Sequence, residues 1–172
     1  MATTDNTVSG INYYGITEDF NSIQNVEVSQ GRYFQQSDFD QGANVIIIGN
    51  EVAENLFSKP EKAVGKMVDM KNGKRAVVIG LIKKQGNSIL GGFEYDKSII
   101  LPYHFMESIT LERNANPVIM VQGKDEVPME QLKDELGAAM RSIRKLKPTQ
   151  EDNFSLNDID SFREFMDNIF GY

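Results

Sequence analysis

The sequence predicts an α+β protein, in which a strand-rich middle region precedes one long helix flanked by two short strands. Three observations predict this class. A continuous β-branched run occupies residues 45–48, an Asn-Gly pair separates apolar runs at 66–70 and 75–82, and residues 128–147 carry apolar side chains at spacings of three and four. The first pattern is typical of a buried strand, the second of a hairpin and the third of an amphipathic helix.

The elements of the first part of the chain follow from local composition. β-favouring residues at 8–14 and alternating valines at 26–30 predict short strands, with a helix between them that Thr17 caps. A cluster of polar residues and glycine at 37–42 predicts a turn. After the β-branched run, Asn50 is placed to cap a short helix whose apolar residues face inward: Val52, Ala53, Leu56 and Phe57.

The next elements begin with the hairpin around Asn72 and Gly73, where a type I′ turn requires positive φ at both positions. A strand at 98–101 follows, and Pro102 is well placed at the start of a helix that extends to residue 109.

The last third predicts a βαβ unit, with strands at 118–122 and 153–156 on either side of the helix that Pro128 begins. Acidic residues early in this helix and basic residues late in it match the helix macrodipole. An apolar terminal helix then starts at Asp158 or Asp160.

The composition excludes several functional classes. The 172 residues carry 18 Lys and Arg against 25 Asp and Glu, a formal net charge of −7, whereas proteins that bind nucleic acid need a basic face. The negative net charge also disfavours binding to anionic membrane surfaces. Because the sequence has no cysteine, disulfides, thiolate metal ligands and cysteine nucleophiles are excluded. Its apolar runs are too short to span a bilayer.

Residues that carry enzyme chemistry are few. The single histidine, His104, has no accompanying nucleophile, and we interpret it as a structural side chain rather than a general base. A zinc site would need several carboxylates beside it. The glycines of residues 86–93 do not form a phosphate-binding loop, since Gly92 and Phe93 stand where that loop requires Lys and Ser or Thr. We therefore expect no enzyme activity, no catalytic residue, no cofactor and no metal site.

The segment 83–94 is the one feature with a specific functional interpretation. It is a long glycine-containing loop with large apolar side chains, which either fold back onto the core or form a contact for a partner protein. The candidate partner-contact residues are Gln85, Asn87, Ser88, Ile89, Leu90 and Phe93.

Residues 8–156, nearly the whole chain, contain a series of short motifs, each of which occurs once and in a fixed order. It comprises Val8-x-Gly10, Gly31-Arg32-x-Phe34 followed by Asp38, Val45 to Gly49, Ala53-x-x-Leu56-Phe57, Ala63-Val64-Gly65-Lys66, Val77 to Leu81, Ile100-Leu101-Pro102-Tyr103 and, after the long helix that ends in basic residues, Asp152-x-Phe154. Each motif is weak alone, but their order and spacing are fairly specific. The series resembles the MacB-like periplasmic core domain of ABC-transporter permeases, a family that includes the lipoprotein-releasing and FtsX-like permeases.

The resemblance implies a two-lobed architecture. Residues 1–22 and 113–172 would form a porter-like lobe of split βαβ units, and residues 23–112 an inserted strand-rich lobe called Sabre. Family members carry a further strand and long helix ahead of the position of Val8, so we expect an N-terminally shortened fragment. The family's transmembrane helices are likewise expected outside these residues.

The resemblance also implies a function without catalysis in this domain. Such a domain lies on the periplasmic side of a bacterial inner membrane and couples ATP-driven motion in the cytoplasm to an extracytoplasmic partner or cargo during export. The implied partners are the ATPase domain or subunit of the same transporter, a periplasmic adaptor or carrier protein, and a second permease in a dimer. The alternative is a stand-alone soluble periplasmic protein-binding module.

Overall fold

The computed structural model describes residues 2, 6–86, 93–111 and 116–159 of the chain. The chain forms two compact units, residues 1–120 and residues 121–172. Among the described residues, no helix combines the length and the apolar character that crossing a membrane requires.

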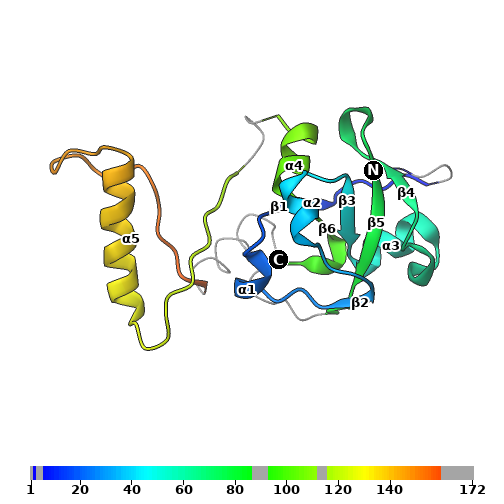
Figure 1. Cartoon of the computed structure of the whole chain (residues 1–172), viewed down its shortest axis with the longest axis horizontal. Coiled ribbons are helices and arrows are strands. Elements are labelled where there is room, and N and C mark those ends of the chain that lie inside the picture. The colour runs from blue at the N-terminus through cyan, green and yellow to red at the C-terminus, as the bar shows by residue number, and fades with distance from the viewer. Residues whose placement is uncertain (1, 3–5, 87–92, 112–115, 160–172) are drawn as a thin grey trace. The chain divides into compact units, whose positions relative to one another are not determined.

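The first unit is built on a mixed β-sheet (Figure 1), which confirms the α+β class. The strand order is β1-β6-β3-β5-β2, and β4 pairs with β5 beside this path. β1 with β6 and β3 with β5 are parallel pairs, whereas the remaining pairs are antiparallel. The strands of the described residues are β1 (Asn12–Ile16), β2 (Val28–Gly31), β3 (Val45–Ile48), β4 (Met67–Asp69), β5 (Arg75–Ile82) and β6 (Ser98–Pro102).

The main hydrophobic core lies on one face of this sheet. Alternate residues of β3 and β6, such as Ile46 and Ile99, are fully buried there. The helices α3 (Asn50–Phe57) and α4 (Tyr103–Ile109) contribute their buried side chains to the same cluster. As predicted, α3 follows the β-branched strand and Pro102 immediately precedes α4. The predicted capping role of Asn50 is wrong, because Gly49 occupies the N-cap position and Asn50 is the first residue of the helix.

The short helices α1 (Phe20–Ile23) and α2 (Gln36–Asp40) complete the regular helices described in this unit. The sequence prediction of a turn at 37–42 is wrong for the α2 residues. Gln35 and Asp38 form a capping box, in which each side chain accepts a hydrogen bond from the other residue's backbone N–H. This reciprocal capping holds the polar segment in a helical turn. Phe39, which lies in the same helix, has a buried side chain.

The hairpin between β4 and β5 has the predicted positive φ angles, 57° at Asn72 and 69° at Gly73. Its loop is longer than the expected two residues: Lys71–Gly73 form a 3₁₀ turn, and the Met70 N–H donates to the Lys74 carbonyl at 2.7 Å. The Asn72 side chain also donates to the Ile109 carbonyl at 3.0 Å, which ties the turn to the end of α4.

We expect Gly73→Val to destabilise the first unit by about 1 kcal/mol or more, because a β-branched side chain is strained at positive φ. Urea unfolding followed by circular dichroism measures the change. Lys74→Val is the matched control, since Lys74 has an extended backbone with φ of −77°. Equal midpoints for the two variants would contradict the prediction.

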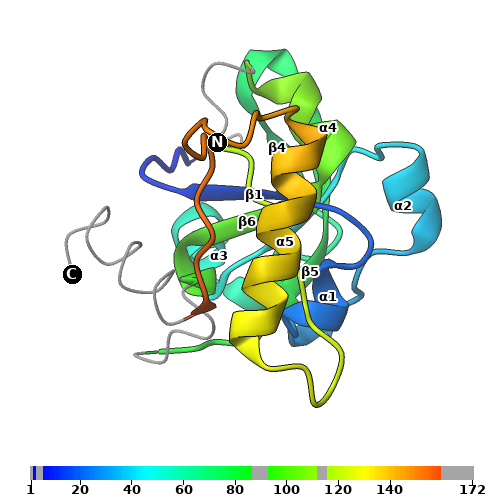
Figure 2. The same ribbon diagram turned by 90° about the vertical axis from the view of Figure 1, so that its left-hand side faces the viewer.

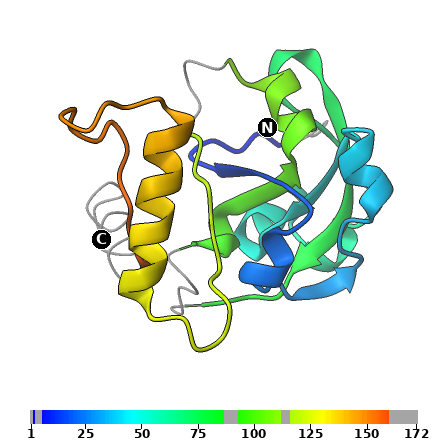
Figure 3. The same cartoon turned by 60° about the vertical axis from the view of Figure 1, so that its left-hand side comes forward.

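The second unit contains the helix α5 (Met129–Ile143), which Pro128 precedes as predicted. Beyond a turn, the chain returns alongside α5, as the orange segment in Figures 2 and 3 shows. The turn begins with Lys145 at a φ of 54°, and the Leu146 N–H donates to the Arg141 carbonyl at 2.9 Å. This left-handed ending stops the helix before the predicted residue 147.

The predicted strands at 118–122 and 153–156 are wrong: neither segment forms a strand in the structure. A strand exists only as part of a ladder, and the described residues supply no partner strand for either segment. Val118 and Ile119 are accordingly 63% and 78% exposed. The predicted terminal helix lies outside the described residues beyond Ile159.

β1 pairs with β6 along its whole length, so residues 12–16 belong to the sheet of the first unit. The sequence-based assignment groups residues 1–22 with residues 113–172 in a porter-like lobe, apart from residues 23–112. That assignment stays a prediction.

Candidate functional site

The motif around Arg32 forms a compact polar cluster at the end of β2. Arg32 Nη1 donates to Asp38 Oδ2 at 2.7 Å and to the Tyr33 carbonyl at 3.1 Å. The Gln35 N–H donates to the same Asp38 oxygen at 2.8 Å. Phe34 and Phe39 are buried beside this cluster, with ring centroids 5.5 Å apart. The contacts of Arg32, Phe34 and Asp38 therefore indicate a structural role, which fixes α2 to the sheet.

The Asp38 carboxyl is charged at neutral pH because its partners outweigh its burial. Burial raises its pKa, but the hydrogen bonds from Arg32 and from the Gln35 backbone, together with the Arg32 charge, bring the pKa below its ordinary value. A carboxyl with a lowered folded-state pKa contributes stability above its unfolded pKa, and that contribution is lost as the pH falls through the folded pKa.

We expect Asp38→Asn to lower the free energy of unfolding at pH 7 by about 1 kcal/mol, because it removes the charged cap and the Arg32 partner. Urea unfolding at several pH values measures this difference. The difference in unfolding free energy between the two proteins should begin to narrow as the pH falls to about 4, the ordinary pKa of an unfolded Asp, and should be lost as the pH falls through the lower pKa of the folded Asp38 carboxyl. A gap that stays constant from neutral to strongly acidic pH would contradict the assignment.

Two of the motif glycines, Gly31 and Gly49, lie where two backbones approach closely. An added Cβ at Gly31 would lie 2.1 Å from the Ile79 carbonyl oxygen. At Gly49, it would lie 2.0 Å from the Tyr95 oxygen and 2.4 Å from the Asp96 oxygen. The Gly49 N–H donates to the Ser98 carbonyl at 2.9 Å. Gly49 thus joins the end of β3 to the segment that leads into β6.

That segment also anchors both described ends of the predicted partner-contact loop. The Asp96 carboxylate accepts hydrogen bonds from the backbone N–H groups of Gln85 and Gly86, each at 3.0 Å. In return, Gln85 Oε1 accepts from the Tyr95 N–H at 2.9 Å. The two chain segments that bound the loop are therefore held together at its base. This reciprocal pairing was not predicted, because Gln85 and Asp96 form no recognised motif.

Aromatic rings form the floor beneath the loop base. Phe93 is 6% exposed and stacks on Tyr95, and its ring meets those of Tyr14 and Phe20 edge-on. Burial raises the pKa of the Tyr95 hydroxyl, with smaller contributions from Tyr14 and Tyr33. The same burial raises the pKa of Tyr33 to about 12. Tyr33 and Tyr95 therefore stay neutral at physiological pH and act as packing groups.

The predicted contact residues divide into two groups. Gln85 is half-buried at the loop base and Phe93 is a core residue. Asn87, Ser88, Ile89 and Leu90 lie outside the described residues. The partner-contact role of the loop stays a prediction, and Phe93 would serve it by anchoring the loop.

His104 lies on the exposed side of α4, where Nδ1 is 2.9 Å from Glu107 Oε2. It borders an open cleft of about 240 Å³ whose floor includes Ile16 and Phe39 and whose rim carries Glu18, Asp19 and Asp40. The described residues place no group of three or more His, Asp or Glu side chains where they could hold a metal ion.

Comparison with known proteins identifies the family. A family model described as the MacB-like periplasmic core domain matches residues 1–139. The chain is 29% identical over 126 residues to the uncharacterized ABC transporter permease YknZ of Bacillus subtilis, which covers 72% of this chain and 29% of that protein. It is 27% identical over 161 residues to the macrolide export ATP-binding/permease protein MacB of Neisseria meningitidis, with coverages of 92% and 23%. The chain thus spans less than a third of these relatives' length.

Solved structures share the fold. The periplasmic region of MacB from Actinobacillus actinomycetemcomitans superposes with a TM-score of 0.67 at 19% identity, covering 94% of this chain and 67% of that chain. The extracellular domain of YknZ from Gram-positive bacteria gives a TM-score of 0.57 at 22% identity, with coverages of 78% and 65%. The chain therefore belongs to the family of MacB-like periplasmic core domains, which are extracytoplasmic domains of ABC-transporter permeases.

Proposed function

We propose that this domain couples ATP-driven motion in the cytoplasm to a periplasmic partner or cargo during export, without catalysing a reaction itself. The observation that carries the proposal is the family match over residues 1–139. Relatives named as export ATP-binding/permease proteins support it, because in them a domain of this kind belongs to the same chain as an ATPase.

Three partners follow from this role: the ATPase domain or subunit of the same transporter, a periplasmic adaptor or carrier protein, and a second permease in a dimer. Residues 1–22 and 113–172 would form the porter-like lobe and residues 23–112 the inserted lobe. We assign the adaptor or carrier contact to the loop residues Asn87, Ser88, Ile89 and Leu90. The pinned base formed by Gln85 and Asp96, with Phe93 packed below, supports this because it would fix where the loop emerges.

The coupling is tested in the full-length permease, assembled with its ATPase in lipid nanodiscs. A single cysteine at the exposed position Ser29 carries a fluorescent label. We expect the label's signal to change when ATP is added, and to stay unchanged in a transporter whose ATPase cannot bind ATP. A fluorescence signal that is the same with and without ATP would contradict the coupling role.

The loop contact is tested separately, with alanine at residues 87–90 of the full-length protein. We expect a purified adaptor to lose most of its stimulation of ATP hydrolysis, while the basal rate stays unchanged. Alanine at four exposed residues elsewhere in the first unit, Gln30, Lys59, Glu61 and Lys74, is the control. Unaltered stimulation in the loop variant would exclude the contact and leave the coupling role standing.

The second candidate is a stand-alone soluble periplasmic protein-binding module. The parent reading frame discriminates between the two. Apolar segments of about 20 residues flanking this domain would establish the permease, since that length spans a bilayer. A reading frame without them would favour the soluble module.

A further inference from the structure

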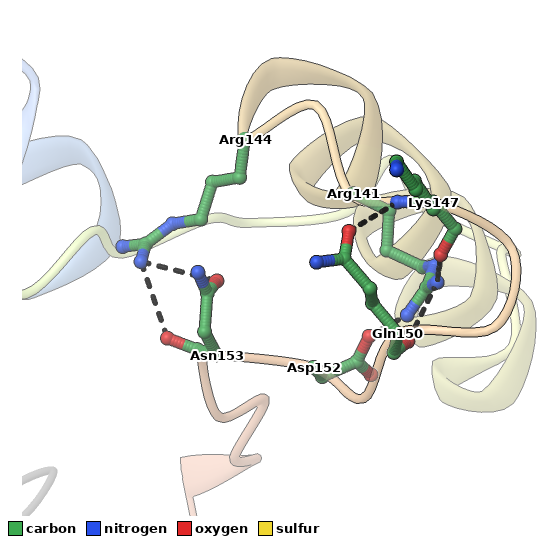
Figure 4. Close-up of polar contacts among 6 residues, drawn as sticks. All are labelled: Arg141, Arg144, Lys147, Gln150, Asp152 and Asn153. Carbon is green, nitrogen blue, oxygen red and sulfur yellow. Dashed lines mark hydrogen bonds and ion pairs between the residues drawn. The ribbon is translucent and has the colours of Figure 1, made fainter.

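Two arginines at the end of α5 hold the returning chain by polar contacts (Figure 4). Arg141 is ion-paired through Nη1 with the Asp152 carboxylate, and its Nη2 donates to the carbonyls of Lys147 and Gln150 at 2.8 Å and 2.9 Å. One guanidinium thus joins three points of the turn and of the returning segment. Its planar fork of donors suits this arrangement, which a lysine could not reproduce.

Arg144, three residues after Arg141, also contacts the returning segment. Its Nη1 donates to the Asn153 backbone carbonyl at 3.1 Å and to the Asn153 side-chain oxygen at 3.2 Å. The turn itself is braced by Gln150, whose side chain accepts from the Lys147 N–H at 2.7 Å. Further back along α5, Lys133 Nζ pairs with Asp158 at 3.0 Å.

Apolar packing contributes little between these elements. No residue of α5 is buried, Ile143 is 73% exposed, and Leu156 and Ile159 of the returning segment are 36% and 47% exposed. Leu156 lies over Gly137, the one position of α5 without a side chain. An element that buries many apolar side chains separates from its neighbours only when the whole domain unfolds. Few apolar side chains are buried between α5 and the returning segment, so this segment can open locally.

We propose that Arg141 and Arg144 form a latch that holds residues 150–158 on α5, and that this segment opens as a unit while α5 stays helical. The second unit then has two arrangements, closed and open, and the balance between them depends on the arginine contacts. Because the ion pairs are partly exposed, salt screens them and favours the open arrangement. The inference does not rest on the proposed transport role.

The test uses electron paramagnetic resonance on the full chain, which has no native cysteine to interfere with labelling. Spin labels on Asp134→Cys and Ser155→Cys, both exposed positions, report the distance between α5 and the returning segment. We expect one short, narrow distance at low salt. In Arg141→Gln/Arg144→Gln, a longer and broader population should appear and dominate. Raising the salt from about 0.01 M to about 1 M should shift the wild type in the same direction.

Lys124→Gln removes one positive charge from an exposed position outside the latch and serves as the control, with an unchanged distance expected. Circular dichroism at 222 nm shows whether α5 remains helical in each variant. Three outcomes would overturn the proposal: a broad distance in the wild type at low salt, an unchanged distance in the double arginine variant, or loss of helix in that variant.

Discussion

Gly49→Ala is expected to destabilise the first unit by about 3 kcal/mol, the upper range for overpacking a tightly packed site. Its Cβ would lie 2.0 Å and 2.4 Å from two backbone carbonyl oxygens, and neither can rotate away as a flexible side chain would. Relief requires moving β3 away from the segment that leads into β6. Urea or thermal unfolding of the purified chain measures the loss.

The matched control is Gly137→Ala, the same chemical change in the middle of α5. An added Cβ there meets only Leu156 Cδ1, at an ordinary contact distance of 3.5 Å. Alanine favours a helix interior over glycine by about 1 kcal/mol, so this variant should be as stable as the wild type or more so. If the two variants lost stability equally, the close approach at Gly49 would not be the cause.

Phe93→Ala should cost about 3–5 kcal/mol, the usual range for deleting a buried aromatic side chain. The ring contacts three other aromatic rings, those of Tyr14, Phe20 and Tyr95, and truncation leaves a cavity among them. Denaturant unfolding gives the change in stability. Exchange of the Tyr95 amide should also accelerate, because the segment that holds its hydrogen bond to Gln85 loses its packing.

Met67→Ala is the control for this prediction, because Met67 is 50% exposed and a surface truncation changes stability little, by about 0.5 kcal/mol or less. A Phe93→Ala variant as stable as Met67→Ala would mean that the ring is dispensable to the core. That result would instead favour the interpretation that Phe93 contacts a partner protein.

The sequence predicted elements well where local signals and tertiary packing agree. Residues 45–48 are strongly β-branched and also sit in the middle of the sheet, so both influences favour a strand. Asn72 and Gly73 have the predicted positive φ angles, because Asn and Gly adopt the left-handed conformation more readily than other residues. Pro102 and Pro128 mark helix starts correctly to within one residue: each occupies the N-cap position, with an extended ψ, immediately before α4 and α5.

Prediction failed where the outcome depends on residues distant in sequence. Val118 to Gln122 has strand propensity, but a strand needs a neighbour, and no local pattern tells whether one is present. The helical turn of α2 depends on the reciprocal bonds of Gln35 and Asp38, a variant of the capping box that lacks the usual Ser or Thr and Glu.

The candidate site shows the same division. The loop could be located from its glycines, whereas its anchoring by Asp96 depends on the chain that follows β5 lying beside the chain that precedes β6. Nothing in the spacing of Gln85 and Asp96 indicates a mutual contact. The burial of Phe93 likewise depends on Tyr14 and Phe20, which are more than 70 positions away in the sequence.

The pairing of β1 with β6 has a consequence for how the chain reaches this fold. Asn12 lies opposite Ser98, and 86 positions separate them. Closing so long a loop costs conformational entropy before the pairing yields any stabilising contact, whereas β4 and β5 need only a short turn. Docking of β1 should therefore be a late event, on a sheet whose inner strands have already formed. During synthesis, β1 leaves the ribosome long before its partner and must wait, unpaired, until residue 102 has emerged.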